Sequence, residues 1–295
     1  MKINPILENN PEKHLYLFDI ELNQQTLEQF SGINYVIMQG SSKRSEVLAR
    51  KLADKVLKID SRFFKSVNLV NTSDYAVYRV GNILSVSHGM GNVTIDALLH
   101  AVTKLLYYAG SHDVEYIRVG TSGGIGVEPG TVVVTKNAYM PNLAPYYTTY
   151  ELGQRIDTPT NLDHKLVERI LTAQPDNLPF PIISGNSIAA DDFYLGQCRY
   201  DGAMPARKDR AWREEFFQKV HALDIRNFEM ESSAMGAFCN RAEIPATMIA
   251  VTLLNRFKGD QVSATPEQLA EFSDRSQAVV INYLLSRADV KLHTN

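Results

Sequence analysis

The sequence predicts a single α/β domain: a three-layer α/β/α sandwich around a central mixed sheet. Short apolar, β-branched runs alternate with stretches in which apolar residues recur at helical spacing, and this alternation is typical of one layered α/β structure. With 295 residues, 44% of them hydrophobic and 21% charged, the chain can bury an ample core. We place this domain at residues 31–295 and expect residues 1–30 to form an N-terminal arm that packs on the body or at a subunit interface.

Charge and cysteine content argue against several classes of function. The formal net charge is -3 at pH 7, so no basic field indicates binding to nucleic acid or to an anionic membrane surface. No apolar run reaches the length of a membrane span, and residues 1–5 lack a signal-peptide core. Cys198 and Cys239 alone provide neither a disulfide framework nor a zinc site. We therefore expect a cytoplasmic protein that binds no metal, nucleic acid or membrane.

The first strand and helix frame a candidate anion site. Residues 34–38 are the first apolar run that predicts a strand, and they lead through the small residues of 39–44 into a helix at 45–52. A small-residue loop that enters a helix N-terminus can bind an anion, and Arg44 adds a positive charge at its edge. The alternative is an ordinary strand-to-helix turn with a surface arginine.

A hairpin and a glycine turn follow. Residues 75–80 and 82–87 alternate around a glycine, which predicts two antiparallel strands. The turn His88-Gly-Met-Gly then precedes a helix at 95–108. His88 is a candidate ligand or acid–base group, but a lone histidine in a turn is more often a structural residue, and we adopt that interpretation.

Glycines crowd into residues 118–126, which read Arg-Val-Gly-Thr-Ser-Gly-Gly-Ile-Gly. This stretch follows the apolar run 114–117, which predicts a buried strand. Glycines let the backbone adopt positive φ and approach a ligand, so successive N–H groups could form an anion-binding concavity beside Arg118. The alternative is a tight turn between two strands, because residues 127–134 return as another apolar run.

Two further stretches carry polar groups between predicted elements. Residues 191–202 bring an aromatic ring, an amide and a guanidinium together, groups that stack on a planar ring and hydrogen-bond its edges. The alternative is a surface loop with a buried Phe193. In Glu229-Met-Glu231, two carboxylates flank a methionine where a strand becomes a helix, and helix N-terminal acids explain only one of them. The remaining predicted elements are a helix at 162–171, a strand at 182–188, a strand at 246–254 and a final helix at 266–287.

Several blocks of residues occur in one order, at 85–91, 105–109, 118–126, 192–194 with 196–197, 199 and 201–203, 226–227 with 229–233, and 251–256. On these blocks the chain resembles, from residue 34 to about 261, the nucleoside phosphorylase family and, within it, the animal uridine phosphorylases. The resemblance implies that family's fold and a homodimer with sites at the subunit interface. It also implies cleavage of uridine by phosphate to uracil and ribose 1-phosphate in pyrimidine salvage, a pentosyl transfer that uses phosphate as co-substrate and no cofactor.

The resemblance assigns roles to individual residues. The phosphate-binding residues of the family match Gly40, Arg44, Arg118 and Thr121. Its uracil-binding residues match Phe193, Gln197, Arg199, Leu253 and Leu254, and its ribose contacts match Thr121, Met230 and Glu231. Of these, Arg118, Thr121, Gln197 and Arg199 are expected to act in catalysis. Asn255-Arg256 stands where purine-selective relatives carry an aspartate, which favours a pyrimidine substrate.

Four positions depart from the family pattern. Leu17 replaces a histidine that usually binds the 5′-hydroxyl in the neighbouring subunit's site, and Asp74 replaces an arginine that clamps phosphate across the interface. A carboxylate several ångströms from phosphate is repulsive by roughly 1 kcal/mol or more. In the base-binding loop, Leu195 replaces a glutamate and Cys198 a glycine. The sequence therefore predicts a uridine phosphorylase with weakened phosphorolysis.

Other functions stay open at this stage. One alternative is a catalytically impaired or inactive paralogue that binds uracil or a nucleoside. Another is a nucleosidase, in which water replaces phosphate. If the alignment near positions 17 and 74 shifts by a residue or two, His14 or Arg79 would supply the missing groups. A Rossmann dehydrogenase is disfavoured, because the glycines lack Gly-x-Gly-x-x-Gly spacing and a partner acid.

Overall fold

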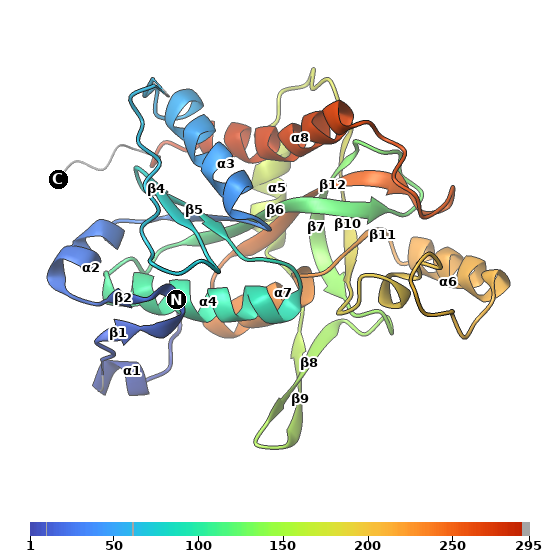
Figure 1. Ribbon diagram of the computed structural model, residues 1–295, viewed down its shortest axis with the longest axis horizontal. Helices are drawn as coiled ribbons and strands as arrows, with labels where there is room; N and C mark the ends of the chain where they lie inside the picture. The colour runs from blue at the N-terminus through green and yellow to red at the C-terminus, as the bar shows by residue number, and fades with distance from the viewer. Residues whose placement is uncertain (10, 61, 291–295) are drawn as a thin grey trace.

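A mixed eight-stranded sheet forms the centre of the computed structural model, which describes residues 1–9, 11–60 and 62–290 (Figure 1). The strand order is β11-β10-β7-β12-β6-β3-β5-β4. Pairs such as β3–β6 and β12–β6 are parallel, whereas β12–β7 and β4–β5 are antiparallel. The strands are β3 (Tyr35–Gln39), β4 (Val77–Val80), β5 (Ile83–Ser87), β6 (Glu115–Gly124), β7 (Val132–Tyr139), β10 (Ile182–Ala189), β11 (Ile225–Glu229) and β12 (Ala246–Asn255).

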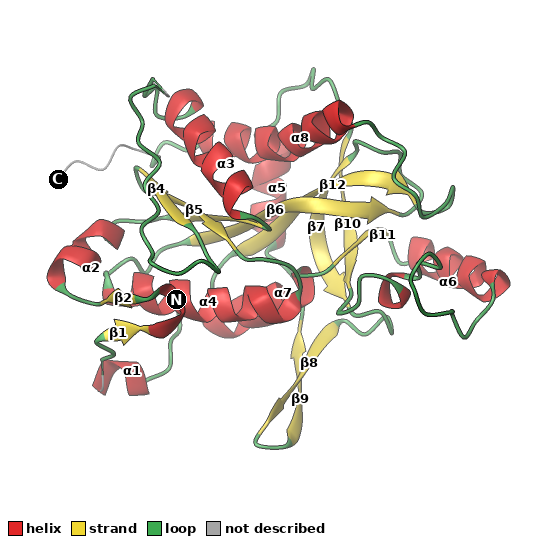
Figure 2. Cartoon of the chain, in the orientation of Figure 1, coloured by secondary structure: helices red, strands yellow, loops and turns green. Residues whose placement is uncertain are grey.

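Helices cover both faces of this sheet, as Figure 2 shows. One face carries α3 (Ser42–Lys55), α5 (His164–Thr172) and α8 (Pro266–Leu285), and the other carries α2 (Gln24–Phe30), α4 (Asn92–Tyr108) and α7 (Ser232–Ala242). Alternate strand residues divide between the two cores: Ile37 packs under α3 and α8, and Met38 packs under α4 and α7. The predicted three-layer sandwich around a mixed sheet is confirmed.

Local signals fix where the helices begin. The Ser41 side chain accepts a hydrogen bond from the backbone N–H of Arg44 at the start of α3. At the start of α8, Thr265 and Gln268 form a reciprocal capping box in front of Pro266. The final helix therefore begins at the proline that the sequence indicates. No helix in the described part of the chain is both long enough and apolar enough to cross a membrane.

The N-terminal residues form short elements that contribute to the core. They comprise α1 (Ile6–Asn9), β1 (His14–Leu15), the 3-10 turn η1 (Tyr16–Phe18) and β2 (Ile20–Glu21), followed by α2. Leu15, Phe18 and Phe30 are buried in the cluster beneath α4. Contact of residues 1–30 with another subunit stays a prediction, and the last five residues of the predicted domain 31–295 lie outside the described residues.

The hydrophobic patterns of the sequence do not predict one hairpin and one helix that the structure contains. The hairpin of β8 (Tyr146–Glu151) and β9 (Gln154–Pro159) projects from the body, so its strands are partly exposed and show no burial alternation (Figure 1). Helix α6 (Arg210–Ala222) buries only Phe217 and Val220. Elements that bury so little carry a weak hydrophobic period.

The glycine stretch 118–126 is mostly strand rather than a bend. β6 continues through Gly124, with residues 116–122 paired to β12 in parallel register and its far end paired to β11. The stretch is therefore extended rather than bent, and β3 pairs with β6 only as far as Arg118, so an anion site along the backbone beyond it stays a prediction. The turn to the next strand comes only after Gly124, so the alternative of a tight turn holds only for the end of the stretch.

Candidate active site

Arg118 lies at the centre of the site, on β6. It is only 5% exposed and stands in register between Met38 of β3 and Met248 of β12. Its guanidinium folds along the strand over Gly120: a Cβ at residue 120 would lie 2.5 Å from Arg118 Nη1. Glycine is therefore required at position 120 so that the guanidinium can lie against the backbone, not so that the backbone can turn.

Two buried carboxylates face this guanidinium, Glu229 at the end of β11 and Glu231 at the N-cap of α7. Glu231 forms an ion pair with Arg118 Nη2, and its other oxygen accepts the N–H of Gly91 at 2.7 Å. Glu229 Oε2 lies 3.6 Å from Arg118 Nη1 and also accepts the backbone N–H of Glu231 at 2.8 Å. Burial raises the pKa of Glu229 to about 7, although Arg118 opposes this shift. The helix N-terminal interpretation thus fits Glu229, and Glu231 is turned toward Arg118.

A second guanidinium lies beside the first. Arg44 folds back over Gly40, where a Cβ would lie 2.8 Å from its Nη2, and its Nε donates to Ser41 Oγ at 3.3 Å. Burial and the charge of Arg118 lower the pKa of Arg44. Two desolvated cations, Arg44 in the first turn of α3 and Arg118 on β6, therefore form a site for an anion.

A different network holds Gln197, near α6. Gln197 is buried, and its Oε1 accepts a hydrogen bond from Arg256 Nη2 at 2.9 Å. Arg256 in turn lies against Gly123 of β6, where a Cβ would lie 2.6 Å from its Nε. Since an arginine only donates, the Gln197 carbonyl must face Arg256 and its amide NH2 is directed elsewhere. β6 therefore carries both halves of the site, with Arg118 over Gly120 and Arg256 over Gly123.

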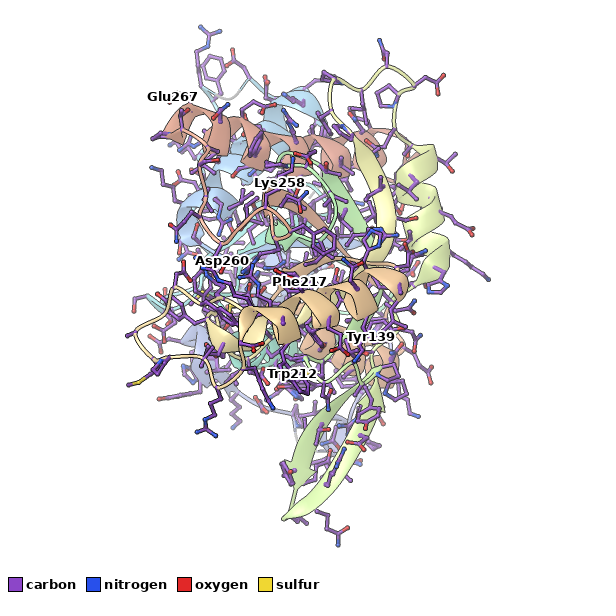
Figure 3. The ribbon with its side chains drawn as sticks, turned by 90° about the vertical axis from the view of Figure 1, so that its right-hand side faces the viewer. Tyr139, Trp212, Phe217, Lys258, Asp260 and Glu267 are labelled. Carbon is purple, nitrogen blue, oxygen red and sulfur yellow. The ribbon has the colours of Figure 1, made fainter. Side chains whose placement is uncertain are left out.

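Asp260 anchors this second network from the loop after β12. It accepts two hydrogen bonds from Arg213 of α6, both at 2.9 Å, and one from Arg256 at 3.2 Å. Figure 3 views the molecule from the side that carries α6, with Asp260 and Phe217 above the helix and Trp212 below it. Sequence reasoning missed Arg213 and Asp260. The sequence marks Arg256 as a residue that follows a strand, but no sequence pattern predicts its contact with Gln197.

The loop after β10 presents Phe193 and Arg199 together. Arg199 makes two hydrogen bonds to Asp201, at 2.9 and 2.6 Å, and its Cζ lies 4.8 Å from the centroid of the Phe193 ring. This is a cation–π arrangement. Phe193 is 40% exposed, so the alternative of a surface loop with a buried Phe193 is wrong.

The structure does not bring every expected residue to one place. Leu254 and Met230 are buried near the ends of β12 and β11. Leu253 instead packs against the core beneath α3 and α8, on the face of the sheet opposite Arg118. Thr121 is half-buried on β6, in register with Val251.

Leu17 and Asp74, which depart from the family pattern, make ordinary local contacts in the structure. Leu17 packs against the core beneath α4, and Asp74 is exposed in a turn where its N–H donates to Thr72 Oγ1. Arg79 donates to the carbonyls of Gln29 and Ser31 at the end of α2. Because these bonds occupy its guanidinium, Arg79 is a poor substitute for the expected phosphate clamp. His14 is exposed and paired with Asp19.

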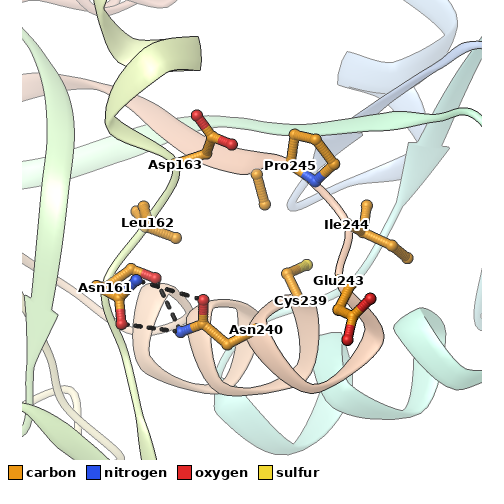
Figure 4. Close-up of a pocket in the computed structure, with 9 residues that line it drawn as sticks. Asn161, Leu162, Asp163, Cys239, Asn240, Glu243, Ile244 and Pro245 are labelled. Carbon is orange, nitrogen blue, oxygen red and sulfur yellow. Dashed lines mark hydrogen bonds between the residues drawn. The ribbon is translucent and has the colours of Figure 1, made fainter. Parts of the chain in front are cut away.

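Several hollows among the described residues lie apart from this site, and two of them adjoin α7. A cavity of about 230 Å³ is enclosed by the end of α7, the start of β12 and residues 161–163 (Figure 4). Within it, Asn240 Nδ2 donates to the carbonyl of Asn161 at 3.0 Å. A larger hollow of about 910 Å³ lies between the N-terminal segment, α4, α7 and the β8–β9 hairpin. Neither includes Arg118, Glu231 or Gln197.

The sequence pattern of the Phosphorylase superfamily matches residues 34–286, which contain all of the elements that build the site. The chain belongs to the Phosphorylase superfamily.

Within this superfamily, the chain is similar to proteins named uridine phosphorylases. Uridine phosphorylase 1 of Mus musculus is 35% identical over 283 residues, which cover 95% of this chain and 90% of the relative. Inactive uridine phosphorylase B of Schistosoma mansoni is 32% identical over 262 residues, covering 87% and 86%. The crystal structure of uridine phosphorylase from Schistosoma mansoni in complex with uracil matches with a TM-score of 0.91 at 31% identity, covering 98% of this chain and all 100% of that one. The predicted nucleoside phosphorylase fold is confirmed.

Proposed function

We propose that this member of the superfamily is a uridine phosphorylase, a pentosyltransferase that cleaves uridine with phosphate to uracil and ribose 1-phosphate. The observation that carries the proposal is the position of Arg118, which lies beside Arg44 and pairs with Glu231. An anion and a ribose hydroxyl-binding carboxylate would then meet at one guanidinium. The resemblance adds pyrimidine salvage as the setting and the cytoplasm as the compartment.

In the proposed mechanism, Gly40, Arg44, Arg118 and Thr121 hold phosphate on one face of the sugar. A phosphate oxygen forms a bond to C1′ as the C1′–N1 bond breaks, and the electron pair of that bond passes to N1 of uracil. Phosphate and the Glu231 carboxylate both favour positive charge on the ribosyl group between them. Met230 would contact the ribose, and the reaction uses phosphate as co-substrate and no cofactor.

On the other side of the sugar, polar groups would stabilise the departing uracil. The Gln197 amide is oriented by Arg256, and Arg199 is held over Phe193 by Asp201. Donors aimed at the uracil edge favour the negative charge that builds on the ring. Phe193 and Leu254 would provide the apolar contacts to the ring, and Leu253, on the opposite face of the sheet, would not.

The protein would act as a homodimer with its sites at the subunit interface. Tyr16, Met90 and Val93 are exposed apolar side chains on η1 and at the start of α4. Gly91, which lies between Met90 and Val93, binds Glu231 through its N–H. A partner seated over these side chains would cover the edge of the site.

A catalytically impaired paralogue that binds uracil or a nucleoside is the second candidate. Asp74 and Leu17 favour it, because neither supplies the group that the family usually has at its position. A relative described as inactive shares 32% identity with this chain, so loss of activity occurs among similar sequences.

Uridine incubated with the purified protein separates these candidates. We expect uracil and ribose 1-phosphate to form only when phosphate is present, followed by the change in ultraviolet absorbance and by phosphate consumption. Release of free ribose without phosphate would instead identify a nucleosidase. Uracil binding in calorimetry without turnover would identify the impaired paralogue.

Gly120→Ala tests the anion site without removing a charge. The new methyl group would lie 2.5 Å from Arg118 Nη1, so the Arg118 guanidinium must move away from residue 120. Losing one charge-assisted hydrogen bond should weaken phosphate binding about ten- to hundredfold, measured by calorimetry. Gly185→Ala is the control, because its Cβ would lie 2.5 Å from Cγ of another arginine, Arg226. Equal phosphate affinity in both variants would contradict the assignment of Arg118.

A further inference from the structure

His88 is a buried histidine whose ring has no settled partner. It follows β5 directly, its exposed fraction is 0%, and its backbone N–H donates to the carbonyl of Gln39. Among the described residues, neither ring nitrogen makes a hydrogen bond of normal geometry to a protein group. A buried polar group left in this state costs about 1–3 kcal/mol, and such groups in native proteins usually have a partner that is a water, an ion or a ligand.

The strand register puts His88 in a row with the two arginines. Val86, Met38 and Arg118 are paired across β5, β3 and β6. The pairing of β3 with β5 ends at Gln39 and Ser87, so Gly40 and His88 are the next residues after these two neighbouring strands. Gly120 lies two residues beyond Arg118 on β6. The guanidinium of Arg44 lies over Gly40 and that of Arg118 over Gly120. An imidazole and two guanidiniums thus line three neighbouring strands, which are spaced about 4.8 Å apart.

Burial and two nearby guanidiniums favour the neutral form of the His88 ring. Burial lowers the pKa of His88 well below its ordinary value, and the charges of Arg118 and Arg44 lower it further. The backbone of Gly89 raises this pKa, but by less than the other causes lower it. The carboxylate of Glu231 belongs to the same surroundings, since it accepts the N–H of Gly91. A neutral imidazole still has one N–H donor and one acceptor nitrogen. His88 can therefore add a hydrogen bond to an anion without adding a third positive charge to a crowded site.

We propose that His88 is a phosphate-binding residue that donates a ring N–H to the phosphate held by Arg44 and Arg118. This inference rests on the proposed phosphorylase function. It replaces the interpretation of His88 as a purely structural residue, because a structural histidine would make its hydrogen bonds within the protein. The ligand class is a tetrahedral oxyanion, and inorganic phosphate is the probe.

Calorimetry with inorganic phosphate and, separately, with uracil tests the proposal on variants of the full chain. His88→Phe keeps a planar ring and removes both nitrogens, and we expect phosphate affinity to fall about ten- to hundredfold while uracil affinity stays within about twofold. His88→Asn and His88→Gln each place an amide N–H near one ring nitrogen, and one of them should recover most of the affinity. His112→Phe is the matched control, because His112 is exposed and lies against Tyr107.

A second measurement needs no substitution at the site. In protein labelled with 15N-histidine, the ring signals of His88, assigned by their absence from His88→Gln, should shift when phosphate is added, and those of His112 should not. Unmoved His88 signals, an unchanged phosphate affinity in His88→Phe, or an equal loss of phosphate and uracil affinity would each overturn the inference. If the unaltered protein binds no phosphate, the proposed function fails as well, and that result is distinct from the other three.

Discussion

Replacing Arg118 with methionine is expected to lower phosphorolysis about 10²- to 10³-fold and to destabilise the fold by about 3–5 kcal/mol. Both effects have one cause. Arg118 is the buried cation that faces Glu229 at 3.6 Å and pairs with Glu231, so its loss leaves two buried carboxylates without the positive charge that faces them. Turnover with saturating uridine and the free energy of unfolding in urea measure the two effects separately.

The double variant Arg118→Met/Glu231→Gln separates the charge from the chemistry. Removing the Glu231 charge should return part of the lost stability, because one of the two uncompensated carboxylates is gone, but it should return no activity. Arg155→Met is the control: Arg155 is exposed on β9 and pairs with Asp157 at 3.0 Å, so its loss should cost no more than about 1 kcal/mol. A stable Arg118→Met protein would mean that the buried carboxylates are protonated or have another partner.

The layered fold was predictable because the buried apolar residues recur at the spacing of strands and helices. Ile37 and Met38 point to opposite cores, and the run around them was correctly predicted as a strand. The β8–β9 hairpin and α6 were missed for the opposite reason, since few of their side chains are buried. Hydrophobic periodicity reports burial, and elements that bury little leave little of it.

The sequence suggests residue types for the candidate site but not their geometry. The glycines of 118–126 correctly marked a close approach, yet what approaches is the chain's own Arg118 and Arg256 rather than a ligand in a bend. The contact of Gln197 with Arg256 joins residues far apart in the sequence, and that of Arg213 with Asp260 does the same. Pairing of this kind is set by the path of the chain after β12, which no local spacing encodes.

Replacing Asp74 with arginine is expected to strengthen phosphate binding about thirtyfold. If position 74 faces phosphate across a subunit interface, the change removes a repulsion and adds an attraction, each about 1 kcal/mol at about 4 Å in a water-like dielectric. The KM for phosphate should fall, and the KM for uridine should change little. Since Asp74 is exposed and its only hydrogen bonds in the described structure are local, with Thr72 and Ser73, the substitution should not disturb the fold.

Asp176→Arg is the matched control, because it makes the same change in net charge at an exposed loop residue. A gain seen in both variants would report only the altered net charge of the protein, whose reach is limited to the Debye length of about 8–10 Å. A gain confined to Asp74→Arg that disappears when the protein is diluted to monomers would require a second subunit at the site. No gain in either variant would mean that Arg44 and Arg118 bind phosphate without help from position 74, and the weakened activity inferred from Asp74 would then have no physical basis.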